Sequence, residues 1–451
     1  MLPAFKAYDI RGIYPDEVNE DLAAAAAGAF VRYFELAAVV VGRDMRLSSP
    51  FLAQAVIKAL LDEGVYVVDL GLVPSPVIDY TMRARSLPAG ILISASHNPP
   101  EYNGLKLRVL NGNNVIQVSQ GHGLEEIALK AEKLLTGHGA TNLRTGKYYD
   151  LDALPDYLAY MEKAAAGVAG LTLVADYGNG MGAVTARPLF NKLKIKATHL
   201  FDEPDGTYPN HPADPMRAEN YTALKAGVAK ERADLGLFFD GDADRVAVID
   251  EKGQIILADY LLALLVETRL KNKQARGGRV YYDLRASRSV RKTIARCGGL
   301  PCQIPVGNPH CKRALARYGG LLAGENSYHI MFPEHGGSDD ALYTSVQILK
   351  ILTRAGRTLS ELITPYQTHA RVPEFILPRG QADLAALYQK IAAHFKDGQP
   401  TWLDGLTVEH ADWWFNVRAS NTEPVLRLNL EANDHKTVKQ IQARLKRLLK
   451  S

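Results

Sequence analysis

A hydroxyl group at the end of a buried strand is the first feature of this chain that could do chemistry. Ile91–Ile93 is a short apolar run typical of such a strand, and the polar stretch S-A-S-H-N-P-P follows it, from Ser94 to Pro100. The paired prolines prevent the chain from continuing as a helix. Ligands bind at the carboxyl ends of strands in open α/β sheets. Ser96 is therefore a candidate nucleophile or phosphate carrier, and the alternative is a serine that only caps a turn.

Three carboxylates alternate in the stretch D-G-D-A-D-R, which contains Asp240, Asp242, Asp244 and Arg245. Carboxylates this close repel one another, and a divalent cation with oxygen ligands, Mg²⁺ before Ca²⁺, neutralises them most simply. A calcium-binding helix–loop–helix is excluded because Arg245 stands at the sixth position, where that loop requires glycine. The remaining alternative is a solvated acidic turn in which Arg245 balances charge.

Two further loops carry groups that suit a phosphorylated sugar. R-A-S-N-T-E-P, Arg418 to Pro424, offers a guanidinium, hydroxyls and an amide, and such donors suit an oxyanion. G-E-N-S-Y-H, Gly324 to His329, follows an apolar strand. Its alternate residues Glu325, Ser327 and His329 would share a side, which suits hydrogen bonding to neighbouring sugar hydroxyls. An ordinary polar hairpin and a satisfied loop histidine are the alternatives.

A glycine-rich turn supports a competing function. G-N-G-M-G-A, Gly178–Ala183, follows an apolar strand and opens a helix, and Asp202 lies further along the chain after another apolar run. This order fits the fingerprint of a dinucleotide-binding fold and would make the chain a dinucleotide-dependent oxidoreductase. That function would leave the acidic triplet and the Arg418 loop unexplained.

The elements that must position these loops form three α/β segments and a different C-terminal segment. Apolar strands alternate with helices in the first three, which predicts mixed, mostly parallel sheets covered on both faces. From about Arg371 the order changes to strands flanked by helices, typical of a small α+β domain. The expected domains are residues 1–145 with the Ser96 loop, 146–255 with the acidic loop, 256–368 with the Glu325 loop and 369–451 with the Arg418 loop.

Composition places the chain among ordinary globular proteins. Its 451 residues are 47% hydrophobic and 23% charged, and the formal net charge is only +4. A charge this small, without long blocks of one sign, argues against a nucleic-acid partner. Three cysteines without C-x-x-C spacing support neither a disulfide framework nor a zinc site, which fits a reducing cytoplasm. The sequence also predicts no signal peptide and no membrane partner.

Taken together and in this order, the four loops resemble those of the α-D-phosphohexomutase family, most closely its phosphomannomutase/phosphoglucomutase branch. The resemblance extends from A-Y-D-I-R-G near the start, through S-A-S-H-N-P, N-G-L-K, D-G-D-A-D-R and G-E-N-S-Y-H, to S-N-T-E-P near the end. It implies four domains, three α/β and one smaller α+β, arranged around a central cleft.

The resemblance also implies a role for each matching residue. Ser96 would be the phosphoserine and would share a Mg²⁺ ion with Asp240, Asp242 and Asp244. The catalytic groups expected around the transferred phosphate, besides Ser96, are Arg11, Lys106, Arg245 and His329. The residues expected to bind substrate are Tyr8, His97, Arg285, Asn308, Glu325, Ser327, His329, Arg418, Ser420, Asn421 and Thr422.

The implied reaction moves phosphate between O6 and O1 of a hexose, mannose or glucose, through a phosphoserine and a hexose 1,6-bisphosphate that is both intermediate and activator. The expected partners are sugar phosphates, and the expected assembly is a monomer or small homo-oligomer. A non-catalytic sugar-phosphate-binding protein on the same fold is the remaining alternative, although the chain retains all the expected transfer groups.

Three positions bear on the choice of sugar. Tyr328, Asn308 and Arg285 depart from the usual residues of the family at positions that line the substrate in relatives. If Glu325 and Ser327 hold O3 and O4 of the sugar, the site would be largely blind to C2, where mannose and glucose differ. The resemblance therefore predicts activity on both sugars.

Overall fold

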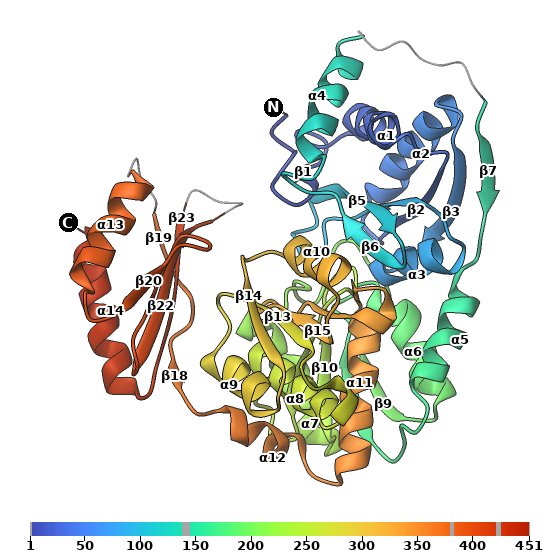
Figure 1. Cartoon of the computed structure of the whole chain (residues 1–451). Helices are drawn as coiled ribbons and strands as arrows, with labels where there is room; N and C mark the ends of the chain where they lie inside the picture. Colours follow the sequence, from blue (N-terminus) through green and yellow to red (C-terminus); the bar gives the residue numbers. More distant parts are fainter. Residues whose placement is uncertain (1, 138–144, 379–382, 421–424, 451) are drawn as a thin grey trace.

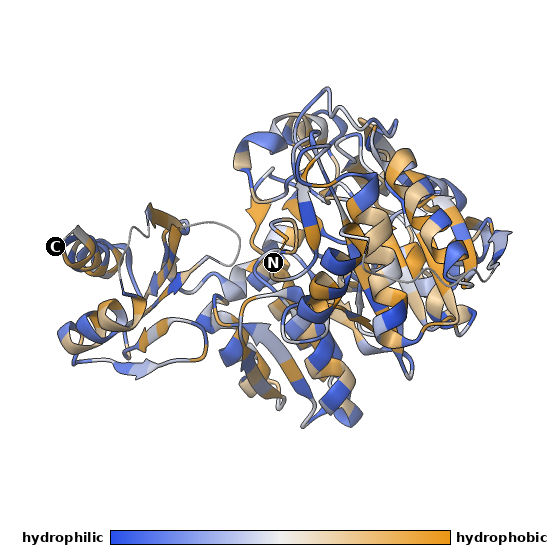
Figure 2. Ribbon diagram, turned by 90° about the horizontal axis from the view of Figure 1, so that it is seen from above, coloured by the Kyte–Doolittle hydropathy of each residue, from blue (hydrophilic) through white to orange (hydrophobic). Residues whose placement is uncertain are grey.

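Four β-sheets organise the computed structural model, which describes residues 2–137, 145–378, 383–420 and 425–450 (Figure 1). The sheets have seven, five, five and six strands, and each is built from a successive part of the chain. We call these parts the first to fourth domains. The fourth domain projects to one side of the other three when the molecule is seen from above (Figure 2).

The first sheet has the strand order β1-β5-β4-β2-β3-β7, with β6 paired to β5. Its strands are β1 (Ile10–Ile13), β2 (Ala38–Arg43), β3 (Tyr66–Leu72), β4 (Ala89–Ile93), β5 (Tyr102–Asn111), β6 (Asn114–Gln117) and β7 (Lys147–Asp150). Its helices are α1 (Glu20–Phe34), α2 (Ser49–Asp62), α3 (Ser75–Ala84) and α4 (Leu124–Leu135). All five residues of β4 are buried, as its apolar sequence predicts. Because β7 pairs with β3, this sheet extends just past the expected boundary at residue 145.

The second sheet has the order β12-β11-β10-β8-β9, and the third has the order β14-β13-β15-β16-β17. The second domain contains α5 (Leu154–Ala164), β8 (Thr172–Asp176), α6 (Gly182–Lys192), β9 (Lys196–Leu200), η1 (Ala218–Tyr221), α7 (Thr222–Glu231), β10 (Leu235–Phe239), β11 (Val246–Asp250) and β12 (Ile255–Ile256). The third contains α8 (Ala258–Leu270), η2 (Lys273–Ala275), β13 (Arg279–Asp283), α9 (Arg288–Arg296), β14 (Leu300–Ile304), α10 (Asn308–Tyr318), β15 (Leu322–Gly324), β16 (Ile330–Phe332), η3 (Pro333–His335), β17 (Ser338–Asp339), α11 (Ala341–Ala355), α12 (Leu359–Ile363) and η4 (Thr364–Tyr366).

The fourth domain is the small α+β unit that the sequence predicts. It consists of β18 (Ala370–Arg371), β19 (Phe375–Pro378), α13 (Leu384–His394), β20 (Gln399–Thr401), β21 (Leu406–Glu409), β22 (Trp413–Ala419), β23 (Val425–Ala432) and α14 (His435–Lys450). Its core is a hydrophobic cluster of its own, whereas a single larger cluster runs through the second and third domains and into one face of the first. The first three domains are therefore packed together more closely than the fourth is packed to them.

The sheets of the first three domains are mixed, as expected, but the expectation that they are mostly parallel is wrong. Among the described strands, parallel and antiparallel pairs are equally numerous in each of these sheets. The reason is that short loops reverse the chain between neighbouring strands, and a short reversal produces an antiparallel pair. These reversals connect β4 to β5, β10 to β11 and β15 to β16.

The reversals are also the predicted functional loops. The Ser96 loop follows β4, the acidic loop follows β10, the Glu325 loop follows β15, and the Arg418 loop begins at the end of β22, which pairs antiparallel with β23. The four domains thus present their polar loops at equivalent positions, one at the end of a strand in each sheet. No described helix is both long and apolar enough to cross a membrane.

Candidate active site

The four polar loops converge on one cavity of about 900 Å³, lined by residues of all four domains. The predicted site residues that line it are Tyr8, Arg11, Ser96, His97, Lys106, Arg245, Arg285, Asn308, Glu325, Ser327, His329, Arg418 and Ser420. Asn421 and Thr422 fall outside the described residues. The acidic triplet lies buried next to Ser96, under the wall of the cavity.

Ser96 is held between the first and second domains. Its Oγ donates a hydrogen bond of 3.0 Å to Oδ2 of Asp240, although the two residues lie 144 positions apart in the chain. Its backbone has φ of 51°, in the left-handed region that residues with a side chain rarely adopt. The backbone N–H of Ser96 donates to the hydroxyl of Ser94 at 2.9 Å. The strand end and the acidic loop therefore fix both the hydroxyl and the backbone of this residue.

A glycine in the acidic loop allows this approach. A Cβ atom on Gly241 would lie 2.3 Å from the carbonyl oxygen of Ser96, which is too close for any residue with a side chain. The hydroxyl of Tyr208, from the loop after β9, donates to the same carbonyl at 3.3 Å. The second domain thus contacts the Ser96 loop through backbone as well as through the carboxylate of Asp240.

Asp240, Asp242 and Asp244 bring carboxylate oxygens to within 4.8 Å of one another. All three are buried, and Asp242 Oδ1 and Asp244 Oδ1 lack a hydrogen-bond partner among the described residues. Buried oxygens without partners are costly unless a cation or donor satisfies them. The triplet therefore fits a hard divalent cation, with Ser96 Oγ at its edge.

Lys106 pairs with two acids of the triplet. Its Nζ lies 2.5 Å from Asp242 Oδ2 and 2.8 Å from Asp244 Oδ2. It stands on β5 directly opposite Leu92 of β4, so the register of this pair places it beside the strand that leads to Ser96. Burial opposes the charge of Lys106, but the two carboxylates outweigh burial and raise its pKa. The side chain is therefore a permanent cation in the site.

Asp240 and Asp242 of the triplet differ in their pKa values. Burial raises the pKa of Asp240 to about 7. Burial also opposes ionisation of Asp242, but the ammonium of Lys106 outweighs it and lowers the pKa of Asp242 to about 2. Asp240, the carboxylate that touches Ser96, is therefore harder to ionise than Asp242, and the guanidinium of Arg245 is its positive partner.

Arg245 and His97 lie on the other side of the Ser96 hydroxyl. Arg245 donates from Nε to Asp240 Oδ2 at 2.9 Å, and its Nη2 lies 2.6 Å from His97 Nδ1 and 3.5 Å from Ser96 Oγ. Burial and the charge of Arg245 hold the pKa of His97 well below its usual value, so this imidazole is neutral. A guanidinium next to the hydroxyl suits a phosphate group on Ser96.

Arg11 reaches the same loop from β1. Its Nη1 donates to Asn98 Oδ1 at 2.7 Å, and its Nη2 lies 2.5 Å from Asp9 Oδ2. The sequence analysis did not single out Asn98 or Asp9. Asn98 could have been found from its place in the polar stretch after β4, whereas the pairing with Asp9 depends on the bend of the chain before β1.

The third domain contributes Glu325, Ser327 and Arg285 to the wall of the cavity. Oε1 of Glu325 accepts a hydrogen bond of 2.8 Å from the N–H of Gly307, and the Ser327 hydroxyl lies 3.5 Å from its Oε2. Arg285 is held by Asp283 at 2.6 Å and lies 3.8 Å from Glu325. These charged and hydroxyl groups are fixed in position and suit a polyhydroxylated ligand.

His329 lies between this wall and the acidic triplet. Its Nδ1 is 2.6 Å from Asp339 Oδ2 and 3.7 Å from Asp244 Oδ1. Burial opposes protonation, but Asp244 and Asp339 outweigh it and raise the pKa of His329. Asn308 donates to Asp339 and also lies 3.2 Å from His329 Nδ1. Sequence reasoning missed Asp339, because its contact with His329 depends on the pairing of β16 with β17.

The fourth domain contributes two guanidinium groups to the cavity. Arg418 is almost completely buried at the end of β22, and its Nη2 lies 3.7 Å from Glu374 Oε1. Arg427, on the neighbouring strand, also lines the cavity, contacts the Ser420 hydroxyl at 3.3 Å and pairs with Glu374 at 2.7 Å. Two guanidinium groups beside a loop of donors suit a phosphate. Arg427 was missed because it is a polar residue in a strand of alternating apolar and polar residues, where polar positions are usually exposed to solvent.

One expectation about the sugar contacts is wrong. Tyr328 does not line the cavity, because its ring is buried and its hydroxyl donates to the carbonyl of Ile256 at 3.1 Å. Its φ of 71° turns the side chain away from those of its neighbours in the loop. Asn308 and Arg285 remain at the cavity wall, so they are the departures that can affect the choice of sugar.

The glycine-rich turn serves packing, not dinucleotide binding. A Cβ on Gly180 would lie 2.9 Å from the carbonyl oxygen of Gly241, and one on Gly182 would lie 2.9 Å from Phe239. The N–H of Met181 donates to Gly241 at 2.9 Å. The glycine-rich turn is therefore packed against the acidic loop and the end of β10. Asp202, the candidate ribose ligand, pairs with Arg187 instead.

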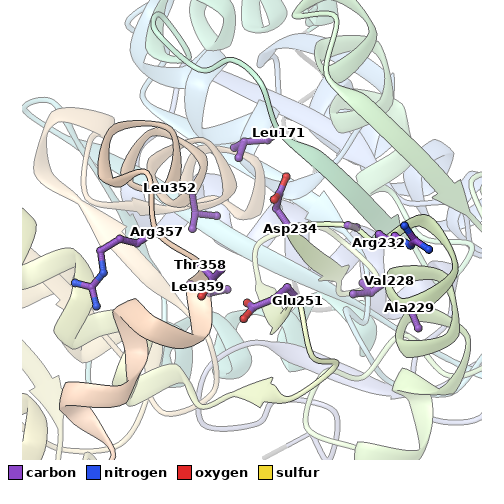
Figure 3. A pocket seen from close by; sticks show the side chains of 11 residues that line it. Leu171, Val228, Ala229, Arg232, Asp234, Glu251, Leu352, Arg357, Thr358 and Leu359 are labelled. Carbon is purple, nitrogen blue, oxygen red and sulfur yellow. The ribbon is translucent and has the colours of Figure 1, made fainter.

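A second pocket, of about 400 Å³, lies between the second domain and helices α11 and α12 (Figure 3). Its acidic residues are already bonded to neighbouring segments. Asp234 accepts a hydrogen bond of 2.8 Å from the N–H of Thr172, and Glu251 accepts one from the hydroxyl of Ser360. The pocket is therefore accounted for by packing between these elements.

Comparison with known proteins agrees with this geometry. The phosphoglucomutase/phosphomannomutase family models for alpha/beta/alpha domains I, II and III match residues 3–135, 155–253 and 258–369, and the model for the C-terminal domain matches residues 376–448. Together these matches cover most of the chain.

Individual relatives are similar over their full length. A phosphomannomutase/phosphoglucomutase of Pseudomonas aeruginosa is 34% identical, with 100% of this chain and 96% of the relative covered. A phosphomannomutase of Methanocaldococcus jannaschii is 32% identical over 99% of this chain and 98% of the relative. The crystal structure of a phosphoglucomutase/phosphomannomutase family protein from Burkholderia thailandensis superposes with a TM-score of 0.90 at 33% identity, covering 100% of this chain and 97% of that chain. The resemblance inferred from the motifs is thus confirmed, and the chain belongs to the phosphoglucomutase/phosphomannomutase family of hexose phosphate mutases.

Proposed function

We propose that this protein interconverts hexose 6-phosphate and hexose 1-phosphate through a phosphorylated Ser96 and a hexose 1,6-bisphosphate. The observation that carries the proposal is the approach of Ser96 Oγ to Asp240 at 3.0 Å, at a cavity with cations on both sides. Arg245 Nη2 lies 3.5 Å from the hydroxyl, Lys106 pairs with the neighbouring acids, and Arg418 lines the same cavity from the fourth domain. A sugar with a phosphate at each end matches this distribution of charge.

The transfer would proceed in two balanced steps. The bond between phosphorus and Ser96 Oγ breaks as a bond to the free sugar hydroxyl forms, and the hydroxyl proton leaves to a base of the site. The bisphosphate then turns around in the cavity. The bond between its other phosphorus and the sugar oxygen breaks as that phosphorus bonds to Ser96 Oγ, and the sugar oxygen takes the proton back from the base. Lys106, Arg11 and Arg245 would oppose the charge on the transferring group, so catalysis comes mostly from positioning and electrostatics. His329 is the candidate for handling the proton, since a lysine held as a cation and an arginine guanidinium cannot accept one.

The acidic triplet would hold Mg²⁺, together with an oxygen of the phosphate on Ser96. When bound, the ion would supply positive charge next to the transferring phosphoryl group. Asp242 Oδ1 and Asp244 Oδ1 support this assignment, because neither has a hydrogen-bond partner among the described residues. Mg²⁺ is preferred over Ca²⁺ because it binds through a few carboxylates plus phosphate oxygens.

Glu325 and Ser327 would bind hydroxyls of the sugar, with Arg285, Asn308 and His97 nearby. Arg418, Ser420, Asn421 and Thr422 would hold the phosphate that is not reacting, and Tyr8 would line the entrance. Since no group of this set is assigned to the C2 hydroxyl, mannose and glucose phosphates should both be substrates. The four-domain division, a monomer or small homo-oligomer and a cytoplasmic location complete the proposal.

The experiment is a turnover assay with mannose 1-phosphate or glucose 1-phosphate, Mg²⁺ and a trace of the matching 1,6-bisphosphate. Wild-type protein should form the 6-phosphate from both, and Ser96→Ala should form none. Retained turnover in Ser96→Ala would refute the phosphoserine. A preference for one sugar by several orders of magnitude would refute dual activity while leaving the reaction intact.

A further inference from the structure

Arg46 lies in the segment that connects β2 to α2, and its side chain is completely buried. The Ser96 loop surrounds its guanidinium group. Nη1 of Arg46 donates to the carbonyl oxygens of Pro99 at 2.6 Å and Tyr102 at 2.8 Å. Nη2 donates to the carbonyl oxygens of Ser96 at 2.9 Å and Asn98 at 2.6 Å. One planar cation thus binds three backbone carbonyls of the loop that carries Ser96 and the carbonyl of Tyr102, the first residue of β5.

The loop's own backbone supplies only part of its support: the N–H of Asn98 donates to the carbonyl of Ala95, and the N–H of Tyr102 donates to that of Pro99. Pro99 and Pro100 have no N–H and cannot donate backbone hydrogen bonds. Ser96 is in the left-handed region, with φ of 51°, and an unfavourable backbone conformation persists only where its surroundings hold it. The fixed fork of a guanidinium can hold several carbonyls at once, which a lysine ammonium cannot do with the same geometry.

The second domain completes the enclosure of Arg46. The Tyr208 ring lies under the guanidinium, with Cζ 5.3 Å from the ring centroid, and the Tyr208 hydroxyl is 3.2 Å from Nη2. A Cβ on Gly206 would lie 2.6 Å from the Cα of Arg46. Asp44, also buried, places Oδ2 3.2 Å from Nε and balances the charge. Arg46 therefore joins the Ser96 loop to the domain that carries the acidic triplet.

We propose that Arg46 is a positioning residue for phosphoryl transfer, which holds the Ser96 backbone so that Oγ stays within hydrogen-bond distance of Asp240. Its side chain is 0% exposed and cannot touch substrate, so it acts only through the loop. This inference rests on the proposed function of Ser96 as the phosphate carrier.

The decisive variant is Arg46→Lys, which keeps the charge but loses the fork. We expect kcat to fall about tenfold or more with KM within about twofold, because reacting geometry is lost while the sugar-binding wall is unchanged. The rate at which a hexose 1,6-bisphosphate phosphorylates Ser96, followed by intact mass, should fall by the same factor.

Arg32→Lys is the matched control. Arg32 of α1 belongs to the same domain and donates to Glu63 at 2.9 and 2.6 Å, and neither residue lines the cavity. This control should lower the midpoint of thermal unfolding and leave kcat unchanged at temperatures well below it. Wild-type kcat in folded Arg46→Lys, or a change confined to KM, would overturn the inference.

If Arg46→Lys does not fold, Tyr208→Phe tests the positioning role of Arg46 in its place. It removes one hydroxyl that touches both Arg46 and the Ser96 carbonyl, and should lower kcat about threefold at temperatures well below its unfolding midpoint. Unchanged kcat in that variant would then overturn the inference. Phosphate uptake by wild-type protein but not by Ser96→Ala, measured in parallel, keeps the proposed function intact whatever Arg46→Lys does. Absence of uptake by wild-type protein would remove both.

Discussion

The orientation and charge of individual side chains in this site depend on partners that are distant in the chain. The hydroxyl of Ser96 meets a carboxylate of the second domain, and Lys106 neutralises two more acids of that domain. Glu325 is fixed by a backbone N–H from Gly307 of another loop. Each side chain is therefore oriented before a substrate arrives, which is the condition for efficient positioning catalysis.

Glu325→Gln tests the sugar contacts at this scale. A hydrogen bond to a charged acceptor contributes about 1.5–3 kcal/mol, so KM should rise about tenfold to a hundredfold. Because the carboxylate is assigned to hydroxyls shared by mannose and glucose, the factor should be the same for both 1-phosphates. Initial rates over a range of substrate concentrations measure it, with Ser327→Ala as a milder variant. A rise for one sugar alone would contradict the assignment.

His211 gives a pH-dependent prediction. Its Nε2 lies 3.1 Å from the buried carboxylate of Asp176, and although burial opposes protonation, this partner raises the pKa of His211 above its usual 6.5. A group whose pKa is raised on folding stabilises the fold below its unfolded pKa, and this contribution is lost as pH rises through the folded pKa.

The matching variant is His211→Gln, which keeps a donor but cannot carry charge. Thermal unfolding should show a larger gap between wild-type and variant midpoints at pH 6 than at pH 8.5. Equal gaps at both pH values would show that the imidazole contributes only packing.

At the scale of elements, the site depends on short reversals between antiparallel strands. The end of each apolar strand could be read from the sequence, since β4, β10 and β15 are buried runs followed by polar loops. The family resemblance then named the groups in those loops. Arg46, Asp339 and Arg427 could not be found in this way, because their contacts depend on how separate strands and loops pack and not on local pattern.

Gly241→Ala tests the contact between two of these reversals. The added Cβ would lie 2.3 Å from the Ser96 carbonyl oxygen, so the acidic loop must move away from Ser96. We expect kcat to fall about tenfold to a hundredfold, since small displacements of reacting groups are costly. Gly28→Ala in α1, where the nearest atom would be 3.4 Å away, is the control and should keep wild-type turnover. Wild-type kcat in Gly241→Ala would mean that the loops do not touch in solution.

At the scale of the whole molecule, a buried lysine joins the first and third domains. Lys312 of α10 lies 2.6 Å from Asp339 and 3.8 Å from Asp79 of α3, and its side chain is 1% exposed. Asp79 is also paired with Arg108 at 2.6 Å. A buried charge network of this kind makes the interface specific, because removal of one member leaves the others unpaired.

Lys312→Met should therefore destabilise the protein strongly. Breaking a buried pair costs about 3–5 kcal/mol, which should lower the midpoint of thermal unfolding by several degrees. Lys58→Met removes an exposed pair with Asp62 and should change the midpoint very little. Calorimetry of the two variants measures both effects, and equal midpoints would contradict a structural role for Lys312.

The ammonium group of Lys106 has a consequence for how the protein folds before it binds a metal ion. Because it already neutralises two acids of the triplet, the chain carries its own counter-ion and can reach its final shape in a cell that is short of magnesium. Treatment with a chelator should abolish turnover yet shift the unfolding midpoint by only about 2 °C, and a collapse by tens of degrees would contradict this. Magnesium supply would then limit how fast the enzyme runs, while the yield of folded chains stays the same.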